Sequence, residues 1–532
     1  MATFGRFHRF PGFHADLICV HLWNLWISFS AFPLEYAPTM NAWDPALLAT
    51  PPLTDADDRL PPAHKLYALR TLPMGEIKAI GFDMDHTLAR YKSPEVDELA
   101  FKKAARLLVR DRGYSPWLLE IEYDPAFAVR GLVLDGLRGN LLKLNRERQV
   151  VRASHGSRAM SKVELDSVYG RRRLSTAAKG FRNIDTLFEI PESHIYAQMV
   201  DGLDQGLLKA ENYLQLFADV RWAIDTAHRN GEMKAEILQH RAFFIPQDPQ
   251  LALALDRLKR AGKKLFLLTN SDWAFTEGVL GHLLNGQDEA RPRWLDYFDL
   301  VVVSSRKPAF FLETPEPIAL EGHPRCFSGG NAPWLEFMLG AQGEEVLYVG
   351  DHIYGDVLRS KKNASWRTLL LVPELERELR LLEAKAVDLR ELYRLETARR
   401  RTLRRASVLQ DQWRRNRARR HVLGQRLSTE AMLALDHEAT QLAASTEALQ
   451  QRADAQHLDL ERLLRAVEAV FNPMWGPMFR DRDELTRFAD QIQQFACAYT
   501  GKVSNLYMYD PLATIYAPVP TLPHERREMV RG

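Results

Sequence analysis

Four short apolar runs, each followed at once by a cluster of polar residues, constrain the fold of this chain most strongly. They cover residues 77–82, 264–268, 300–303 and 346–349, and a fifth run, 367–372, ends at Pro373. Apolar runs of this length, separated by helix-like segments, are typical of parallel strands buried on both faces. The pattern therefore predicts an α/β fold built on a doubly wound parallel sheet.

The polar clusters after the first four runs are Asp83-Met84-Asp85, residues 269–272 (TNSD), residues 304–308 (SSRKP) and residues 350–356 (GDHIYGD). The carboxyl ends of parallel strands meet at one edge of a sheet, where ligands of such folds bind. Taken alone, each cluster has an ordinary interpretation: an Asp-x-Asp pair occurs by chance, Thr-Asn forms turns, and a lone lysine usually lies at the surface. At four successive strand ends they predict one functional crevice.

The residue types in this crevice predict phosphoryl chemistry. Asp83 and Asp85 would repel each other at the mouth of a buried strand unless a cation offset their charge. Asp351 and Asp356 would complete an oxygen site for a hard cation, for which Mg²⁺ is the best candidate. One carboxylate can then attack phosphorus while the second protonates the leaving oxygen. Lys307 would supply a compact positive charge as the transition state develops.

The uneven spacing of the runs predicts several substructures in the 532 residues. The segment between Asp85 and Thr269 has room for an inserted cap over the crevice, and helix starts are expected at Asp248 and around Ile190. The expected organisation is an N-terminal extension at 1–45, a catalytic core at 46–93 and 245–373, the cap at 94–244, a long helical hairpin at 374–470, and a C-terminal segment at 471–532 that packs back on the core.

The expected hairpin carries a block of arginines between residues 399 and 420, with Trp413 among them. Such a block is typical of a solvated helix face whose long side chains cover their neighbours. The alternative is a stripe that binds RNA or DNA. A total of 71 Lys+Arg against 69 Asp+Glu gives a net charge of +2, which argues against polyanion binding by the chain as a whole.

The N-terminal region leaves two interpretations open. Residues 15–32 are mostly apolar and approach membrane-spanning length, but three polar residues interrupt them and no small-residue cleavage motif follows. They belong either to a poorly ordered extension or overlong gene start, with Met40 as an alternative start, or to a signal or membrane-contacting segment. Three widely separated cysteines indicate a reducing compartment. We expect a cytoplasmic protein that does not bind membranes.

The four clusters, in this order, resemble the four motifs of the haloacid dehalogenase (HAD) superfamily. The stretches FDMDHTLARYKSPE, FLLTNSD, RKPAFF and LYVGDHIYGDVLRSKK are similar to those of the cytosolic purine 5′-nucleotidase family. The similarity runs from about residue 66 to about residue 378 and returns near residues 478 and 522–525. The helical hairpin diverges, which leaves its role open.

The resemblance implies a role for each residue of the crevice. Asp83 would be the nucleophile and Asp85 the acid/base. Mg²⁺ would be held by the Asp83 carboxylate, the Asp85 backbone carbonyl and Asp351, with Asp356 in support. The phosphate would be held by four residues: Thr269, Asn270, Ser271 and Lys307.

The resemblance also implies a substrate class, purine nucleoside monophosphates with a 6-oxo group such as IMP and GMP. The nucleotide-binding positions fall on five residues: Phe188, Arg221, Asp225, His228 and Lys234. Arg221, Asp225 and His228 are spaced so that one helix would present them on a common face. Taken alone, such a face is typical of a solvated or salt-bridged helix, and a Phe in an apolar stretch is usually core.

Further implications are phosphotransfer to nucleosides, activation by a nucleotide effector, and assembly into a homodimer or homotetramer. Asp185 and Arg229 differ from the residues of better-known members near the effector site, whereas Tyr354 and Lys362 still match it. Two alternatives remain for the function. One is an HAD phosphatase for another small phosphomonoester, and the other is a phosphatase-like scaffold whose basic helices bind nucleic acid.

Overall fold

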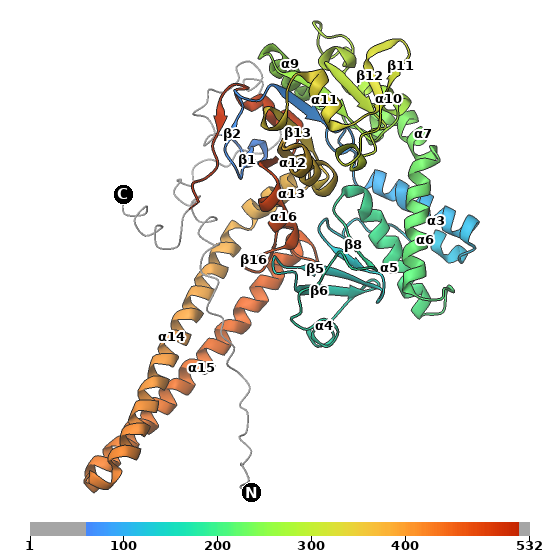
Figure 1. The fold of residues 1–532 in the computed structure, drawn as a ribbon. Coiled ribbons are helices and arrows are strands. Elements are labelled where there is room, and N and C mark those ends of the chain that lie inside the picture. The colour runs from blue at the N-terminus through green and yellow to red at the C-terminus, as the bar shows by residue number, and fades with distance from the viewer. Residues whose placement is uncertain (1–59, 521–532) are drawn as a thin grey trace.

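A nine-stranded sheet forms the centre of the molecule (Figure 1). The computed structural model describes residues 60–520, so the expectations for residues 1–45 and 15–32 fall outside the described range. In spatial order the strands are β1 (Tyr67–Ala68), β17 (Ala498–Thr500), β14 (Arg367–Leu371), β13 (Val346–Gly350), β3 (Ala79–Phe82), β9 (Lys264–Leu268), β10 (Leu300–Val303), β12 (His323–Gly329) and β11 (Pro317–Leu320). Neighbours from β17 to β12 pair in parallel, and β1 and β11 add antiparallel edges.

The predicted doubly wound sheet is confirmed. β9 and β10 have the predicted bounds, and β3, β13 and β14 differ from the predicted runs at one end only. The parallel strands β12 and β17 were outside the predicted runs, because their sequences, HPRCFSG and AYT, are not continuous apolar stretches. The regular apolar strands could therefore be predicted, and the mixed or very short ones could not.

The strand order reverses at β3, which lies between β13 and β9. From β3 the chain builds β9, β10 and β12 on one side of this strand and then returns to build β13, β14 and β17 on the other. A reversal of this kind opens a crevice beyond the carboxyl ends of the central strands. The fold thus places the crevice where the Asp83-Met84-Asp85 cluster follows β3.

Helices cover both faces of this sheet. On one face, strand residues such as Ile80 and Leu265 pack with α9 (Pro249–Arg260) and α10 (Trp273–Leu284). On the other, Phe266 and Tyr348 pack with α11 (Ala332–Leu339), and α12 (Arg359–Ala364) leads into β14. The helix start predicted at Asp248 is confirmed, since the Asp248 side chain accepts a hydrogen bond from the Gln250 backbone N–H.

A second substructure, the cap, is inserted between β3 and β9. Its antiparallel sheet has the order β7 (Arg158–Ala159), β6 (Val150–His155), β5 (Asn140–Leu144), β4 (Val133–Asp135) and β8 (Phe181–Asn183). Its helices are α3 (Glu95–Arg112), α4 (Lys162–Val168), α5 (Ile190–Asp204), α6 (Tyr213–Arg229), α7 (Glu232–Gln239) and α8 (Arg241–Phe244). The helix start expected around Ile190 is confirmed, with Pro and Glu in the first turn of α5.

After the core, α13 (Leu375–Ala384) leads into α14 (Ala386–Leu423) and α15 (Thr429–Phe471), a helical hairpin that projects from the body (Figure 1). We call residues 386–471 the arm. The buried residues of α15 include Ala439, Thr446 and Ala453, which recur every seven residues. Most arginines of the basic block are exposed on α14. The arm is therefore an antiparallel coiled coil with a solvated basic side.

The C-terminal segment returns to the body. It contains β15 (Arg480–Asp481), β16 (Glu484–Leu485), α16 (Arg487–Phe495), β17, and β18 (Thr514–Ile515), which pairs with β2 (Leu72–Pro73). It therefore supplies a strand to the central sheet as well as a contact with the cap. Within residues 60–520, no helix is long and apolar enough to cross a membrane.

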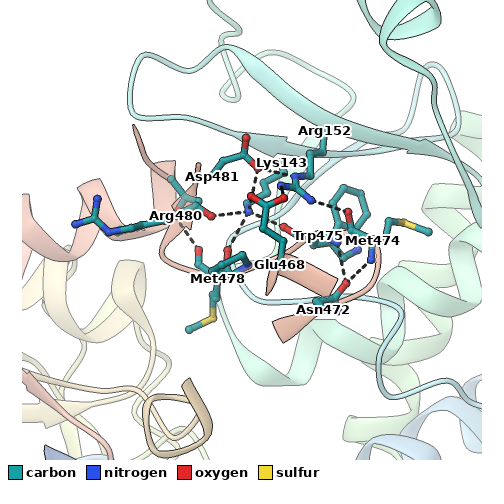
Figure 2. Close-up of polar contacts among 12 residues, drawn as sticks. Lys143, Arg152, Glu468, Asn472, Met474, Trp475, Met478, Arg480 and Asp481 are labelled. Carbon is teal, nitrogen blue, oxygen red and sulfur yellow. Dashed lines mark hydrogen bonds and ion pairs between the residues drawn. The ribbon is translucent and has the colours of Figure 1, made fainter. Parts of the chain in front are cut away.

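The base of the arm meets the cap sheet in a buried polar junction (Figure 2). The ammonium of Lys143 in β5 donates hydrogen bonds of 2.6–2.9 Å to three backbone carbonyls of residues 475–480. Arg152 in β6 forms ion pairs with Glu468 (2.6 Å) and Asp481 (2.5 Å). These contacts tie the end of α15 and the chain that follows it to the cap.

Candidate active site

The first of the two aspartates follows β3 directly and is buried in the crevice. The Asp83 backbone N–H donates to the Val349 carbonyl at 2.9 Å, which continues the pairing of β3 with β13. Met84 is fully buried in the core. Burial raises the pKa of the Asp83 carboxyl to about 7, although the ammonium of Lys307 acts in the opposite direction. The hydrogen bond from the Asp83 backbone therefore fixes the Asp83 carboxyl group at the carboxyl end of β3.

Lys307 lies opposite Asp83 and is almost completely enclosed. Its ammonium is 2.9 Å from Asp83 Oδ1 and 2.8 Å from Asp356 Oδ1, and it donates a hydrogen bond of 2.7 Å to the Tyr348 hydroxyl. Burial lowers the pKa of Lys307, but Asp356 and Asp83 outweigh burial and the pKa lies well above its usual value. The lysine is thus a fixed positive charge beside the Asp83 carboxylate.

Three carboxylates from two strand ends meet in the crevice. Ligand atoms of Asp83, Asp351 and Asp356 lie within 4.8 Å of one another, and all three residues are buried. Asp351 Oδ2 has no hydrogen-bond partner among the described residues. Burial, followed by repulsion from Asp356 and Asp83, raises the pKa of Asp351 well above its usual value. Three buried carboxylates this close together, one of them with an oxygen that lacks a hydrogen-bond partner, form a site that favours a cation.

Asp356 reaches the crevice from a π-helical turn, Ile353–Leu358, after β13. Its Oδ2 accepts a hydrogen bond from the His352 backbone N–H at 3.2 Å, and its side chain lies over Gly350. A Cβ at residue 350 would be 2.4 Å from Asp356 Oδ2. A glycine at the end of β13 is therefore required for this carboxylate to lie where it does.

Three of the four residues expected to hold phosphate follow the end of β9, each with its own partners. The Thr269 hydroxyl is buried and accepts from the Ser271 N–H at 3.0 Å. The Asn270 side chain brackets Lys307: its oxygen accepts from the Lys307 N–H (2.6 Å), and its NH₂ donates to the Lys307 carbonyl (3.0 Å). Ser271 Oγ donates to Asp85 Oδ2 at 2.8 Å. Asn270 thus positions Lys307 in addition to any contact it makes with phosphate.

Asp85 has a second partner that the motifs did not indicate. The hydroxyl of Tyr91 donates to Asp85 Oδ1 at 2.5 Å, so both oxygens of this carboxylate are held. Burial, then the charge of Asp85, raises the pKa of Tyr91 well above its usual value, which keeps the hydroxyl protonated. Tyr91 stands six residues after Asp85 in the stretch FDMDHTLARY, and only the folded loop brings the two together.

An aromatic group from the cap lies beside this loop. Phe188 is 4.4 Å from the ring of His86 and 5.4 Å from the ring of His228, measured between ring centroids. The His228 Nδ1 is 2.8 Å from the Ile224 carbonyl, while its Nε2 is buried without a hydrogen-bond partner among the described residues. Burial lowers the pKa of both imidazoles, that of His86 to about 3. Two of the five expected nucleotide-binding residues thus adjoin the Asp85 loop.

The other three expected nucleotide-binding residues are engaged in ion pairs. Arg221 pairs with Asp225 (2.8 Å) on α6 and with the buried Glu192 (2.8 Å). Lys234 pairs with Asp272 (2.7 Å), the last residue of the cluster after β9. The salt-bridged helix face expected of such residues taken alone is therefore present, and a bound nucleotide would have to share or replace these contacts.

A doubly wound sheet with buried carboxylates and a lysine at its switch point, beneath an inserted cap, defines an α/β enzyme with a capped anionic-ligand crevice. The model of the 5′ nucleotidase family matches residues 66–527, so the chain belongs to that family. It is accordingly a 5′-nucleotidase-type phosphomonoester hydrolase.

Several curated proteins are similar to this chain. A 5′-nucleotidase domain-containing protein of Dictyostelium discoideum is 27% identical over 475 residues, which are 85% of this chain and 73% of the relative. The 5′-nucleotidase domain-containing proteins 2 of Rattus norvegicus and Homo sapiens are 26% and 25% identical, covering 86% of this chain and 80% and 85% of their own lengths.

Solved structures resemble it more weakly. A predicted phosphoglycolate phosphatase of Haemophilus somnus has a TM-score of 0.26 at 14% identity, and CbbY of Rhodobacter sphaeroides with phosphate has 0.24 at 14%. Each match covers 56% of this chain and 86% of the other. TM-scores this low do not define a common fold.

Proposed function

We propose that the chain is a Mg²⁺-dependent 5′-nucleotidase that hydrolyses 6-oxopurine nucleoside monophosphates such as IMP and GMP. The observation that carries the proposal is the meeting of Asp83, Lys307 and the buried carboxylates Asp351 and Asp356 at the switch point of the sheet. Membership of the 5′ nucleotidase family supplies the reaction class.

The acidic residues suit Mg²⁺. Hard divalent cations prefer carboxylate oxygens, and the unpartnered buried Asp351 Oδ2 offers one beside Asp83 and Asp356. The Asp83 and Asp351 carboxylates and the Asp85 backbone carbonyl would hold the ion, with Asp356 in support. When bound, Mg²⁺ would neutralise carboxylate charge and polarise a phosphoryl oxygen.

The residues of the crevice divide the reaction into two steps. The Asp83 carboxylate attacks phosphorus while Asp85 gives a proton to the leaving 5′ oxygen, which breaks the bond between phosphorus and that oxygen. Asp85 then takes a proton from a water, whose oxygen attacks the aspartyl-phosphate and releases inorganic phosphate. Lys307 stabilises negative charge on the phosphoryl group in both steps. Attack by a nucleoside hydroxyl in place of water would give phosphotransfer.

The cap side of the site supports an aromatic, hydrogen-bonding substrate such as a purine. Phe188 offers a partly exposed aromatic ring, and His228 Nε2 is a buried ring nitrogen without a hydrogen-bond partner among the described residues. Asp225 and Arg221 lie about one and two turns before His228 on α6, and Lys234 follows on α7. Guanidinium and ammonium groups can donate to a 6-oxo group, and a carboxylate can accept from a ring N–H.

The test is release of inorganic phosphate from a panel of nucleoside monophosphates, with p-nitrophenyl phosphate and sugar phosphates as comparison substrates. We expect IMP and GMP to be preferred and EDTA to abolish turnover. Asp83→Asn should abolish turnover with the thermal midpoint retained. Asp166→Asn, which alters a surface ion pair with Lys162, is the matched control. Equal rates on IMP and p-nitrophenyl phosphate would favour another small phosphomonoester instead.

An effector site and an oligomeric state also belong to this proposal. A nucleotide effector would bind near Tyr354, which is exposed in the π-helical turn that carries Asp356. The chain would form a homodimer or homotetramer, which light scattering on the purified protein can measure. Phosphate release with and without ATP tests the effector.

A further inference from the structure

Arg130 extends from the cap into the core and contacts the loop that carries Asp351. It lies in the segment before β4, and its guanidinium is completely buried. Nε and Nη2 donate to the two oxygens of Glu374 at 3.0 and 2.6 Å, and Nη1 donates to the backbone carbonyl of Asp351 at 2.9 Å. The guanidinium also lies 5.2 Å from the centre of the Phe488 ring. One side chain thus joins the cap, the end of β13, the start of α13, and α16.

The Arg130 guanidinium has little freedom to rotate where it contacts the Asp351 carbonyl. A buried guanidinium is costly unless its donors are used, and here the bidentate pair with Glu374 fixes its plane. With the plane fixed, Nη1 holds the Asp351 carbonyl from one side. Asp351 begins the loop after β13, so fixing its carbonyl restrains the backbone from which its carboxylate extends.

The backbone next to Arg130 also packs closely against α16. The next residue, Gly131, has φ +93°, and a Cβ there would be 2.5 Å from the Phe488 Cβ. A glycine is therefore required for the segment next to Arg130 to pack this closely against α16. Arg130 is not the only link between the cap and the rest of the described chain, because Lys143 and Arg152 also join the cap sheet to the C-terminal segment (Figure 2).

We propose that Arg130 is a positioning residue for the cation site: braced by Glu374, it holds the Asp351 peptide so that the Asp351 carboxylate points into the carboxylate cluster. The inference rests on the proposed function, because it concerns the cation that the site would bind. Residues that orient a metal ligand from behind typically contribute 10- to 100-fold to metal affinity.

The experiment measures cation binding directly, without turnover. Isothermal titration calorimetry with MgCl₂, and with MnCl₂ as a second probe, is carried out on the full-length protein in the absence of substrate. Arg130→Gln should weaken binding about 10- to 100-fold. Arg130→Lys keeps one donor for the Asp351 carbonyl and should restore part of the affinity. Glu374→Gln removes the charge that braces the guanidinium and should weaken binding in the same direction by less.

Arg152→Gln is the matched control. Arg152 also joins the cap to the C-terminal region through two carboxylates, but it does not touch residue 351. We expect this variant to lower the thermal midpoint and to bind Mg²⁺ within about twofold of the wild type. A purely structural role for Arg130 would instead make the Arg130 and Arg152 variants alike in both measurements.

The outcomes separate this inference from the proposed function. If the wild type binds neither Mg²⁺ nor Mn²⁺, the proposed cation site is wrong. If the wild type binds and folded Arg130→Gln binds equally well, the positioning role is wrong while the proposed function stands. If Arg130→Gln does not fold, Glu374→Gln decides, because Glu374 is partly exposed and its substitution keeps the size of the side chain.

Discussion

At the residue scale, the two aspartates after β3 differ in what holds their carboxylates. Asp83 faces the ammonium of Lys307, whereas both oxygens of Asp85 accept from neutral hydroxyls, those of Tyr91 and Ser271. Two hydroxyl donors fix the orientation of the Asp85 carboxylate, which is what a positioned general acid or base requires. This difference supports the division of roles in which Asp83 attacks and Asp85 carries the proton.

Tyr91→Phe tests that division. Without the Tyr91 hydroxyl, Asp85 keeps only one of its two hydrogen bonds and its carboxylate can rotate. General acid–base catalysis contributes about 10²–10⁴-fold, so we expect kcat to fall about 10- to 100-fold with KM little changed. Tyr114→Phe removes an equivalent bond, from the hydroxyl to Asp219 at 2.8 Å, between the end of α3 and α6, and should leave kcat unchanged. Equal kcat for Tyr91→Phe and wild type would contradict the role.

At the element scale, the end of β13 depends on one glycine. In Gly350→Ala the new Cβ would lie 2.4 Å from Asp356 Oδ2 and 2.7 Å from its Cβ, so the Asp356 side chain must move away from Lys307. We expect activity to fall at least about 100-fold, and the overpacking to cost about 1–3 kcal/mol of stability. Gly424→Ala, at the tip of the arm where nothing lies within 4 Å, is the control and should keep full activity. A fully active Gly350→Ala would show that Asp356 is not needed where it lies.

The arm offers a second test at this scale. Asn416 is buried between α14 and α15, where its NH₂ donates to Glu438 at 2.7 Å and its oxygen lacks a partner among the described residues. A polar residue in a coiled-coil seam specifies register at a cost in stability. Asn416→Leu should therefore raise the free energy of unfolding by about 1 kcal/mol. The expected signs are a higher melting temperature of the helical circular dichroism signal and unchanged phosphate release. A lower melting temperature would contradict this view of the seam.

The elements also show how far sequence reasoning reaches. Continuous apolar runs predicted five strands of the sheet and the meeting of their polar ends, because parallel buried strands have a regular pattern. Contacts that depend on tertiary structure had no such pattern: Tyr91 with Asp85, Arg130 with Asp351, and Asn270 around Lys307. The seven-residue repeat of the arm was present in the sequence and would have indicated the coiled coil.

At the scale of the whole molecule, core, cap and arm meet at α13 and the buried junction of Figure 2. Glu378 of α13 interacts with two residues of this junction, Lys143 and Met478. Burial raises the pKa of Glu378 to about 7, although the charge of Lys143 and a hydrogen bond from the Met478 backbone act in the opposite direction. The folded protein therefore binds a proton here between about pH 4.5 and 7 that the unfolded chain has released.

The Glu378 side chain should therefore contribute to the pH dependence of stability. Since the folded state holds the extra proton, the contribution of Glu378 is greatest below pH 4.5, falls as the pH rises through 7, and is least above it. The difference is at most about 3 kcal/mol. Glu378→Gln, which is neutral at every pH, should have a higher thermal midpoint than the wild type at pH 8, and the gap should close towards pH 5. Glu447→Gln on the exposed side of α15 should follow the wild-type curve. A constant gap between Glu378→Gln and wild type from pH 5 to 8 would mean that Glu378 is ionised in the folded protein and that the junction is held by a charge pair with Lys143.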